Sequence, residues 1–418
     1  MLKNKSRKLI AILSIATLLL VAMLTSMSSA LVSQNSASWF LASDTNSAAI
    51  AIGDVNADGV NEIVSAGYYN DGVSWNGHLV VLNSATMANQ AAVTWRLGSA
   101  TNVAAVAIGD VNGDGKAEIV TGGSFFDGTN WVGQVIVWNG TSLATLGLTN
   151  WRLGQSTTLN AFAVANVSGG IGLDIITGAT LFDGVNHIGH AAVWNGTTLA
   201  LERQTFWRLG TDTFVSSVAV ANVSLGTSLD IVTGGNIFDG TNNIGQLILW
   251  NGTTLAFERL INWRLGTDTY VNSIAIANVS LGSGLEIVTG GEIFDGIGYT
   301  GQLIVWNGTT LATERLVHWR IGLSNTATSI ALGNFSGGST LDIVTAGTYN
   351  DTVRKYAQII DWNSTTLASN SIASWFVTSD TSANSIAIGT IPGFGNRIIE
   401  GGQYWDNTRA VAQVTIWG

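Results

Sequence analysis

The sequence contains no cysteine, so disulfide bonds cannot hold the fold together. Proline occurs only once, at Pro392, which leaves the chain almost free of residues that interrupt the hydrogen-bond ladders of a sheet. Charged residues make up only 11% of the chain, and 27 acidic residues outnumber 17 basic ones. Because a negative surface repels phosphate backbones, we expect no nucleic-acid partner.

Residues 1–30 have the pattern of a secretory signal peptide. A basic segment from Lys3 to Lys8 precedes an apolar run from Leu9 to Leu24, and small residues follow up to Ala30. The run is shorter than the roughly 20 residues of a membrane-spanning helix. We therefore predict a secreted or cell-surface protein that has no membrane span after cleavage. An uncleaved signal anchor is the alternative.

The rest of the chain repeats with a period of 56 residues. A tryptophan marks each unit, at Trp39, Trp95, Trp151, Trp207, Trp263, Trp319 and Trp375. Each unit reads as four short segments rich in β-branched residues, joined by turns of Gly, Asn and Asp. No segment after Ala30 has the helical spacing of about 3.6 residues. Seven such units predict an all-β fold over residues 31–418, a seven-bladed β-propeller of four-stranded antiparallel blades.

The two ends of the chain suggest how the ring closes. The seventh unit stops after its third predicted strand, and Asn35–Phe40 (NSASWF) closely resembles Ser371–Phe376 (SIASWF). We expect Ser33–Phe40 to complete the seventh blade as its outermost strand. This closure would hide a sheet edge that could otherwise pair with other chains.

Two acidic loops carry the residue types that calcium prefers, and they read DVNADGVNE (Asp54–Glu62) and DVNGDGKAE (Asp110–Glu118). Calcium takes about six to eight oxygen ligands in a flexible shell. We predict two calcium sites in blades 1 and 2. The predicted ligands are the side chains of Asp54, Asn56, Asp58 and Glu62 with the Val60 carbonyl, and those of Asp110, Asn112, Asp114 and Glu118 with the Lys116 carbonyl. The alternative is a polar turn whose acidic side chains lie in water.

The five equivalent loops lack most of these carboxylates. They begin at Asn166, Asn222, Asn278, Asn334 and Thr390. Since a single carboxylate offsets little of the cost of dehydrating calcium, we expect Asn and Ser side chains to hold these loops by hydrogen bonds to the backbone.

Three segments of the fifth unit resemble a known repeat. SIAIANV (Ser273–Val279), LEIVTGGEIFDG (Leu285–Gly296) and GQLIVWNGTT (Gly301–Thr310) are similar to the FG-GAP repeat of integrin α-subunit propellers and of related secreted proteins. In that family a loop of the form D-x-D-x-D-G-x-x-D binds calcium, which the two acidic loops match with Asn at the third position and Glu at the last. The resemblance implies an extracellular protein that binds protein or glycan ligands.

Strand alternation predicts two different faces. The loops between the first and second strands and the turns between the third and fourth share one face, here called the bottom. All nine Asn-x-Ser/Thr sequons fall there, at Asn139, Asn166, Asn195, Asn222, Asn251, Asn278, Asn307, Asn334 and Asn363. They predict a glycoprotein if the host glycosylates; the alternative is that Asn is simply a good turn residue, and Asn251-Gly252 suits a type I′ turn.

The opposite face, here called the top, carries an Asp in each turn between the second and third strands and an Arg after most unit tryptophans. We read the Asp as a cap of its own turn, the Arg as the partner of a neighbouring blade's carboxylate, and the tryptophans as packing between blades. The alternatives are a functional charged ring and tryptophan platforms for sugars.

No catalytic motif emerges, and His78 and His190 occupy a position held by glutamine in other units, so they read as structural. The leading hypothesis is a monomeric, non-enzymatic, extracellular interaction or adhesion module for protein or glycan ligands, which bind at the top face. The alternatives are a carbohydrate-binding lectin and a polysaccharide lyase, for which the sequence offers no catalytic base.

Overall fold

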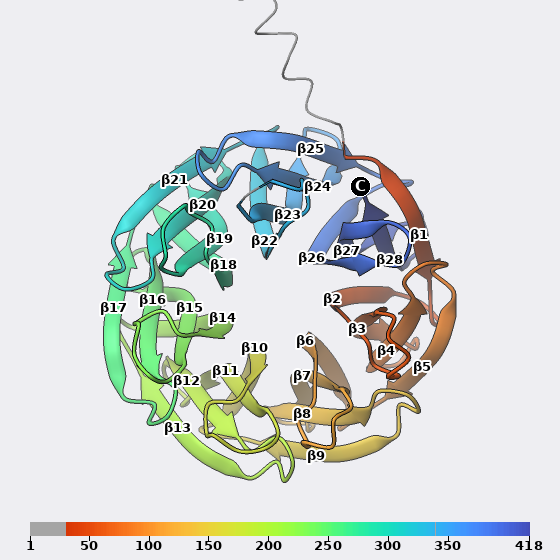
Figure 1. The fold of residues 1–418 in the computed structure, drawn as a ribbon, viewed down its shortest axis with the longest axis horizontal. Helices are drawn as coiled ribbons and strands as arrows, with labels where there is room; N and C mark the ends of the chain where they lie inside the picture. Colours follow the sequence, from red (N-terminus) through yellow and green to blue (C-terminus); the bar gives the residue numbers. More distant parts are fainter. Residues whose placement is uncertain (1–30, 339) are drawn as a thin grey trace, which may run out of the picture.

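A computed structural model describes residues 31–338 and 340–418, so the predicted signal peptide lies outside the described residues. The described residues form seven four-stranded antiparallel sheets arranged as a ring (Figure 1). This confirms the predicted seven-bladed β-propeller. None of the described residues belongs to a helix that is long and apolar enough to cross a membrane.

The blades are given with their strands from the centre outwards. Blade 1 contains β2 (Thr45–Gly53), β3 (Glu62–Asn70), β4 (Trp75–Asn83) and β5 (Asn89–Trp95). Blade 2 contains β6 (Ala100–Gly109), β7 (Glu118–Phe126), β8 (Trp131–Asn139) and β9 (Thr145–Trp151). Blade 3 contains β10 (Ser156–Ala165), β11 (Asp174–Phe182), β12 (His187–Trp194) and β13 (Leu201–Trp207). Blade 4 contains β14 (Asp212–Ala221), β15 (Asp230–Phe238), β16 (Asn243–Asn251) and β17 (Phe257–Trp263).

Blade 5 contains β18 (Asp268–Ala277), β19 (Glu286–Phe294), β20 (Tyr299–Asn307) and β21 (Thr313–Trp319). Blade 6 contains β22 (Ser324–Gly333), β23 (Asp342–Asn350), β24 (Lys355–Trp362) and β25 (Ser369–Trp375). Blade 7 contains β26 (Thr381–Ile391), β27 (Gly395–Trp405), β28 (Ala410–Trp417) and, as its outermost strand, β1 (Ser33–Trp39). Within each blade the four strands are called first to fourth from the centre outwards.

The two ends of the described chain meet in blade 7. Strand β1 pairs antiparallel with β28, with Ser33 opposite Trp417 and Trp39 opposite Ala412. Beyond the strands, the N–H of Val32 donates to the Gly418 carbonyl over 3.0 Å. Figure 1 shows β1 on the outer rim of the ring beside the sheet that holds the C-terminus.

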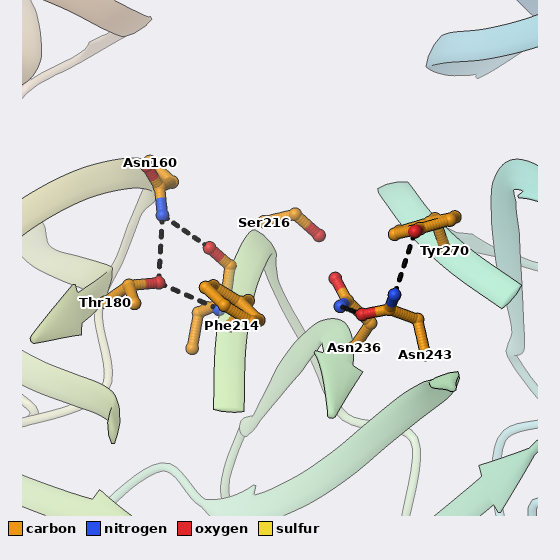
Figure 2. A pocket seen from close by; sticks show the side chains of 8 residues that line it. Asn160, Thr180, Phe214, Ser216, Asn236, Asn243 and Tyr270 are labelled. Atoms are coloured by element: carbon orange, nitrogen blue, oxygen red, sulfur yellow. Dashed lines mark hydrogen bonds between the residues drawn. The ribbon is translucent and has the colours of Figure 1, made fainter. Parts of the chain in front are cut away.

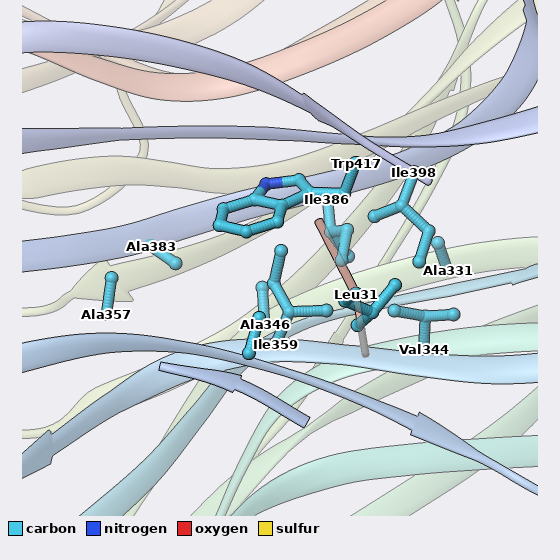
Figure 3. Close-up of a cluster of buried hydrophobic side chains, with 11 residues drawn as sticks. Leu31, Ala331, Val344, Ala346, Ala357, Ile359, Ala383, Ile386, Ile398 and Trp417 are labelled. Carbon is cyan, nitrogen blue, oxygen red and sulfur yellow. The ribbon is translucent and has the colours of Figure 1, made fainter. Parts of the chain in front are cut away.

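The core lies between neighbouring blades, so the middle strands are buried on both sides while the outer strands alternate. Strand β15 is buried along most of its length, whereas β13 alternates between exposed and half-buried residues. One core cluster joins Val232 and Leu249 of blade 4 to Ile274 and Trp306 of blade 5. Figure 3 shows the equivalent cluster where blades 6 and 7 meet, with Leu31 packed among strands of both blades.

The repeated tryptophan packs between blades, as the sequence predicted. The ring of Trp263 lies over Gly245 of its own blade, where an added Cβ would come within 2.8 Å of the indole. Its other neighbour is Trp306 of the next blade, with ring centroids 4.7 Å apart. Only glycine leaves room for an indole there, which explains why Gly and Trp recur together.

Polar side chains also join the first strands of neighbouring blades. Five blades carry one at a bulge of the first strand, and each donates to a backbone carbonyl of the next blade: Asn160 to Val215, Ser216 to Val271, Asn272 to Ala327, Thr328 to Ala383 and Asn384 to Ser47. Blades 1 and 2 carry Ala48 and Ala104 at this position. These two blades, which lack the bond, are the ones with the complete acidic loops.

The turn at Asn251-Gly252 is not the type I′ turn predicted from the sequence. Neither residue has the positive φ that this turn requires, and Leu255 has φ 54° instead. Asn251 begins a longer turn in which its carbonyl accepts from the Leu255 N–H and its side-chain Oδ1 accepts from the Thr254 N–H. Gly252 is needed for a different reason, since a Cβ there would lie 2.4 Å from the Leu229 carbonyl oxygen.

Candidate functional site

The first acidic loop, Asp54–Glu62, connects β2 and β3 at the bottom face. Both carboxylate oxygens of Asp54 accept backbone N–H bonds, from Asp58 over 3.2 Å and from Gly59 over 2.8 Å. Asn56 Oδ1 also accepts from the Asp58 N–H, and Asp58 Oδ1 accepts from the Val60 N–H. The predicted side-chain ligands at the first, third and fifth positions thus wrap around one short stretch of backbone.

The closing residue Glu62 is fully buried and faces the same loop. One of its oxygens accepts from the Val55 N–H and the other from Asn56 Nδ2, each over 3.1 Å. Burial raises the pKa of the Glu62 carboxyl above its usual range, and the negative charges of Asp58 and Asp54 raise it further. An ionised Glu62 therefore lies in a site that favours added positive charge.

The second acidic loop, Asp110–Glu118, repeats this arrangement between β6 and β7. Asp110 accepts from the N–H groups of Asp114 and Gly115, while Glu118 accepts from the Val111 N–H and from Asn112 Nδ2. Burial likewise raises the pKa of Glu118, and Asp114 and Asp110 add to the shift.

The donor types of both loops suit calcium, because each offers three carboxylates, one amide oxygen and backbone carbonyls. The described residues, however, contain no group of three or more His, Asp or Glu side chains that already converge as a metal site. The carboxylates instead accept hydrogen bonds from backbone N–H groups. The chemistry of the donors therefore fits calcium, while a preformed cage of acidic side chains is not present.

The four loops that begin with asparagine hold themselves without such a carboxylate set, as expected from the sequence. In blade 3, Asn166 Nδ2 donates to the Gly170 carbonyl over 2.6 Å and Asn166 Oδ1 accepts from the Gly169 N–H. Asp174 closes this loop by accepting from the N–H groups of Val167 and Ser168. Asn222, Asn278 and Asn334 donate in the same way to Gly226, Gly282 and Gly338.

The acidic residue that closes the loop between the first and second strands makes the same contact in blades 1 to 6. Glu62, Glu118, Asp174, Asp230, Glu286 and Asp342 each accept from the N–H of the second loop residue. The closing position is therefore part of the blade framework. What distinguishes blades 1 and 2 is the pair of additional aspartates at the first and fifth positions.

The sequon asparagines of the bottom face are likewise turn residues. Asn251 Oδ1 accepts from Thr253 and Thr254, and its Nδ2 donates to Glu258 Oε1 over 3.2 Å. Since hydrogen bonds within the turns account for these asparagines, their recurrence alone does not require glycosylation.

On the top face, the repeated aspartate caps its own turn. Asp71 Oδ1 accepts from the N–H groups of Val73 and Ser74, and these backbone bonds are the main reason that the pKa of Asp71 is lowered. The other six turn aspartates make the same pair of contacts. The expected structural role is confirmed.

The top-face arginines do not pair as expected with a neighbouring blade. Arg320 lies 2.7 Å from Asp295, and Arg96 lies 3.7 Å from Asp71, each within one blade. The fourth strand ends beside the turn between the second and third strands of the same sheet, which brings the two residues together. The charges belong to each blade separately rather than to a continuous ring.

The two histidines that stand where other units have glutamine are structural. His78 and His190 are fully buried, and burial lowers the pKa of each to about 4, so both are neutral at pH 7. His187 pairs instead with Asp212, with Nδ1 and Oδ1 3.0 Å apart, on the rim of the top face.

Three top-face positions differ from blade to blade, although the surrounding framework repeats. They lie near the start of the first strand, near the end of the second and at the start of the third. The first-strand position holds Asn46, Asn102, Thr158, Phe214, Tyr270, Thr326 and Ser382. The second-strand position holds Tyr68, Ser124, Thr180, Asn236, Glu292, Thr348 and Gln403. The third-strand position holds Trp75, Trp131, His187, Asn243, Tyr299, Lys355 and Ala410. These are called the variable positions.

The residue that precedes the first variable position is, by contrast, nearly the same in all blades. It is threonine in six blades and asparagine in one. In blade 4 this residue is Thr213, whose Oγ1 accepts from the Leu209 N–H over 2.9 Å and so anchors the entry to the blade. The next residue, Phe214, has no such task, and its position holds five different residue types in the seven blades.

Many of the variable positions line clefts on the top face. One cleft, of about 510 Å³, lies where blades 3, 4 and 5 meet. Figure 2 shows the side chains that line it. Phe214 and Tyr270 supply its aromatic surface, and Asn236 and Asn243 supply amides. Asn243 Nδ2 donates to the Tyr270 hydroxyl over 2.8 Å, which fixes the tyrosine across the blade junction. These residues do not recur at their positions in the other units, so the 56-residue period does not reveal them; variation at fixed positions of the period is the signal that marks them.

Seven four-stranded sheets around one axis define a seven-bladed β-propeller. Within it, residues 54–121 match the family model described as FG-GAP-like repeat, a stretch that includes both acidic loops. The match and the ring together support an FG-GAP-like β-propeller.

The fold is similar to that in the crystal structure of Raptor from Chaetomium thermophilum, with a TM-score of 0.54 and 11% sequence identity. The similarity covers 93% of this chain and 29% of the Raptor chain, so it concerns the propeller fold alone. No curated protein sequence matches this chain.

Proposed function

We propose that this protein is a secreted, non-enzymatic interaction module that binds an extracellular protein or glycan through its top face. In this proposal it acts as a monomer, and calcium stabilises blades 1 and 2. The observation that carries the proposal is the contrast between a repeated framework and the variable positions that line the top-face clefts.

In a repeat protein, contacts with neighbouring repeats fix the framework residues. The tryptophans, their facing glycines and the turn aspartates all recur because each blade needs them. The variable positions differ from blade to blade, and those that line the clefts hold mostly aromatic, amide and hydroxyl side chains. Such side chains are typical of binding surfaces, which combine aromatic anchors with polar groups that give specificity.

We favour binding over catalysis because the recurrent carboxylates already have structural tasks. The top-face aspartates cap turns, and the closing acids of the bottom-face loops bind backbone N–H groups. A lyase would need a base beside a cation that neutralises a uronate, and these groups do not supply one.

Calcium would be held in blade 1 by Asp54, Asn56, Asp58, Glu62 and the Val60 carbonyl, and in blade 2 by Asp110, Asn112, Asp114, Glu118 and the Lys116 carbonyl. When bound, it supplies positive charge that offsets the repulsion among three carboxylates. Blades 1 and 2 also lack the side-chain bond from the first strand to the next blade. Stabilisation of their loops would strengthen the part of the ring with fewer polar links.

The test is a binding screen of the mature protein against displayed extracellular proteins and a glycan array. A top-face variant carries Phe214→Ala and Tyr270→Ala, and a bottom-face control carries Thr253→Ala and Thr365→Ala. Thr253 and Thr365 are exposed turn residues, so the control should keep its fold. We expect the top-face variant to lose ligands that the control retains. Loss of binding in the control with retention in the top-face variant would overturn the proposal.

A further inference from the structure

We propose that the two clefts beside Trp75 form one site for a neutral oligosaccharide, with a sugar ring in each cleft. The inference rests on the proposed top-face function and adds a place and a ligand class to it. It concerns the junctions of blades 7, 1 and 2, away from the cleft of Figure 2.

Trp75 and Tyr68 form a ridge between the two clefts. Their rings meet edge to face, with centroids 5.4 Å apart and an angle of 81°. A cleft of about 330 Å³ lies on one side, where Asn102 and Trp131 complete the lining. A cleft of about 290 Å³ lies on the other side, where Asp44, Gln403 and Trp405 complete it. Because both clefts share the ridge, one extended ligand can contact both.

The exposure of these tryptophans separates them from the repeated ones. Trp75 is 38% exposed and Trp405 is 41% exposed, whereas the 56-residue tryptophan series packs between blades. An exposed indole leaves a large apolar surface in water, and a ligand with an apolar face would cover it. The C–H face of a pyranose ring is such a surface, and the hydroxyl groups at its rim need polar partners.

Polar groups stand beside both aromatic surfaces. Gln403 lines the second cleft, and its Oε1 has no hydrogen-bond partner among the described residues. Asp44 accepts from the Ala410 N–H with Oδ1, which holds its carboxylate at the edge of the second cleft. Asn102 supplies an amide to the first cleft. Aromatic faces flanked by amide and carboxylate groups match a ligand that is apolar on its faces and hydroxylated at its rim.

The charge of the site points to a neutral ligand. The residues that line the two clefts include Asp44 and no lysine or arginine. The whole chain has a net charge of −10. Uronates, sulfated sugars and phosphate groups would meet repulsion without a compensating cation.

The test is saturation-transfer NMR with free neutral tetrasaccharides of glucose, mannose and galactose, and with oligogalacturonate as the acidic comparison. Trp75→Ala is the main variant and Trp75→Phe the conservative one. Phe257→Ala is the control, because Phe257 is an exposed aromatic residue of the outermost strand of blade 4 and lies outside the variable positions and the clefts. Trp405→Ala probes the second cleft independently, and thermal melting checks that each variant folds.

We expect the wild type to bind at least one neutral tetrasaccharide, Trp75→Ala to weaken that binding by about tenfold or more, and Trp75→Phe to retain part of it. Phe257→Ala should bind like the wild type. The inference is overturned if no neutral tetrasaccharide binds at about 10 mM, if only oligogalacturonate binds, or if folded Trp75→Ala and Trp405→Ala bind like the wild type. If these results coincide with loss of a protein ligand in the Phe214→Ala, Tyr270→Ala variant, the sugar site fails while the top-face function stands.

Discussion

The indole of Trp207 at the end of blade 3 lies against that of Trp250 in blade 4, with ring centroids 4.9 Å apart. Trp207 Nε1 also donates to Gln246 Oε1 of blade 4 over 3.0 Å. The same tryptophan pair recurs at six junctions of the ring. One sequence period therefore fixes both the contents of a blade and its contact with the next blade.

Replacing Trp207 should weaken the ring at one junction. Trp207→Ala removes the indole from between two blades, and we expect the free energy of unfolding to fall by about 3 kcal/mol. Urea unfolding followed by circular dichroism measures this loss. Leu201→Ala on the exposed side of the same strand is the control, with an expected change within about 0.5 kcal/mol. Equal effects of the two substitutions would contradict the packing role of Trp207.

Removing residues 31–39 should destabilise blade 7 first. The deletion takes away β1, exposes the edge of β28 and removes Leu31 from the cluster it shares with Trp417. We expect a lower melting temperature and a tendency to associate through the free edge. Hydrogen exchange should speed up first in β28 and β27. Unchanged exchange in these strands would mean that β1 contributes little to closure.

The acidic loop of blade 2 should stabilise the protein more strongly with calcium than without it. Asp110→Ala combined with Asp114→Ala removes two carboxylates that also accept backbone N–H bonds, so we expect a larger fall of the melting temperature in calcium than in chelator. Asn166→Ala in blade 3 is the control, because Asn166 binds the backbone directly. It should lower the melting temperature to the same extent in both solutions. A wild-type melting temperature that is the same with and without chelator would argue against the calcium sites.

Glu292 should make the protein less stable as the pH rises. Burial raises the pKa of its carboxyl from 4.5 to about 7, although Asn272 donates to it over 2.7 Å. Because the folded state holds this proton more tightly, the favourable contribution is complete below pH 4.5 and is lost as the pH rises through 7. The loss amounts to at most about 3 kcal/mol.

The measurement is the free energy of unfolding of the wild type and of Glu292→Gln between pH 4.5 and 8. We expect the difference between the two proteins to grow in favour of the variant over this range. A difference that stays constant with pH would show that Glu292 titrates normally.

The seven-bladed ring could be predicted from the sequence because the 56-residue period appears in residues that pack between blades, such as Trp263, which lies over Gly245. The prediction failed at the turn after β16, since Asn251-Gly252 suits a hairpin turn while the structure adds a buried Leu255 at positive φ. Leu255 packs in one cluster with Val167 and Leu229, and a local turn rule does not include such tertiary contacts. The pairing of Arg320 with its own blade similarly depends on how far the fourth strand runs.

The candidate ligands of the bottom-face loops followed from spacing, but the clefts at Trp75 and Phe214 did not. Phenylalanine occurs once at the position of Phe214, and tryptophan occurs in only two blades at the position of Trp75, so the seven-fold period marks neither residue. Their meaning appears only when the fold brings the ends of three strands together at the top face.

Hydrogen exchange with and without calcium is the most direct test of whether calcium binds only the loops of blades 1 and 2, within a framework that the blades share. The six comparable loops of the same chain serve as internal controls. We predict that calcium slows amide exchange in residues 54–62 and 110–118 and leaves residues 166–174, 222–230, 278–286 and 334–342 unchanged. A uniform response of all six loops, or no response in the first two, would contradict this account.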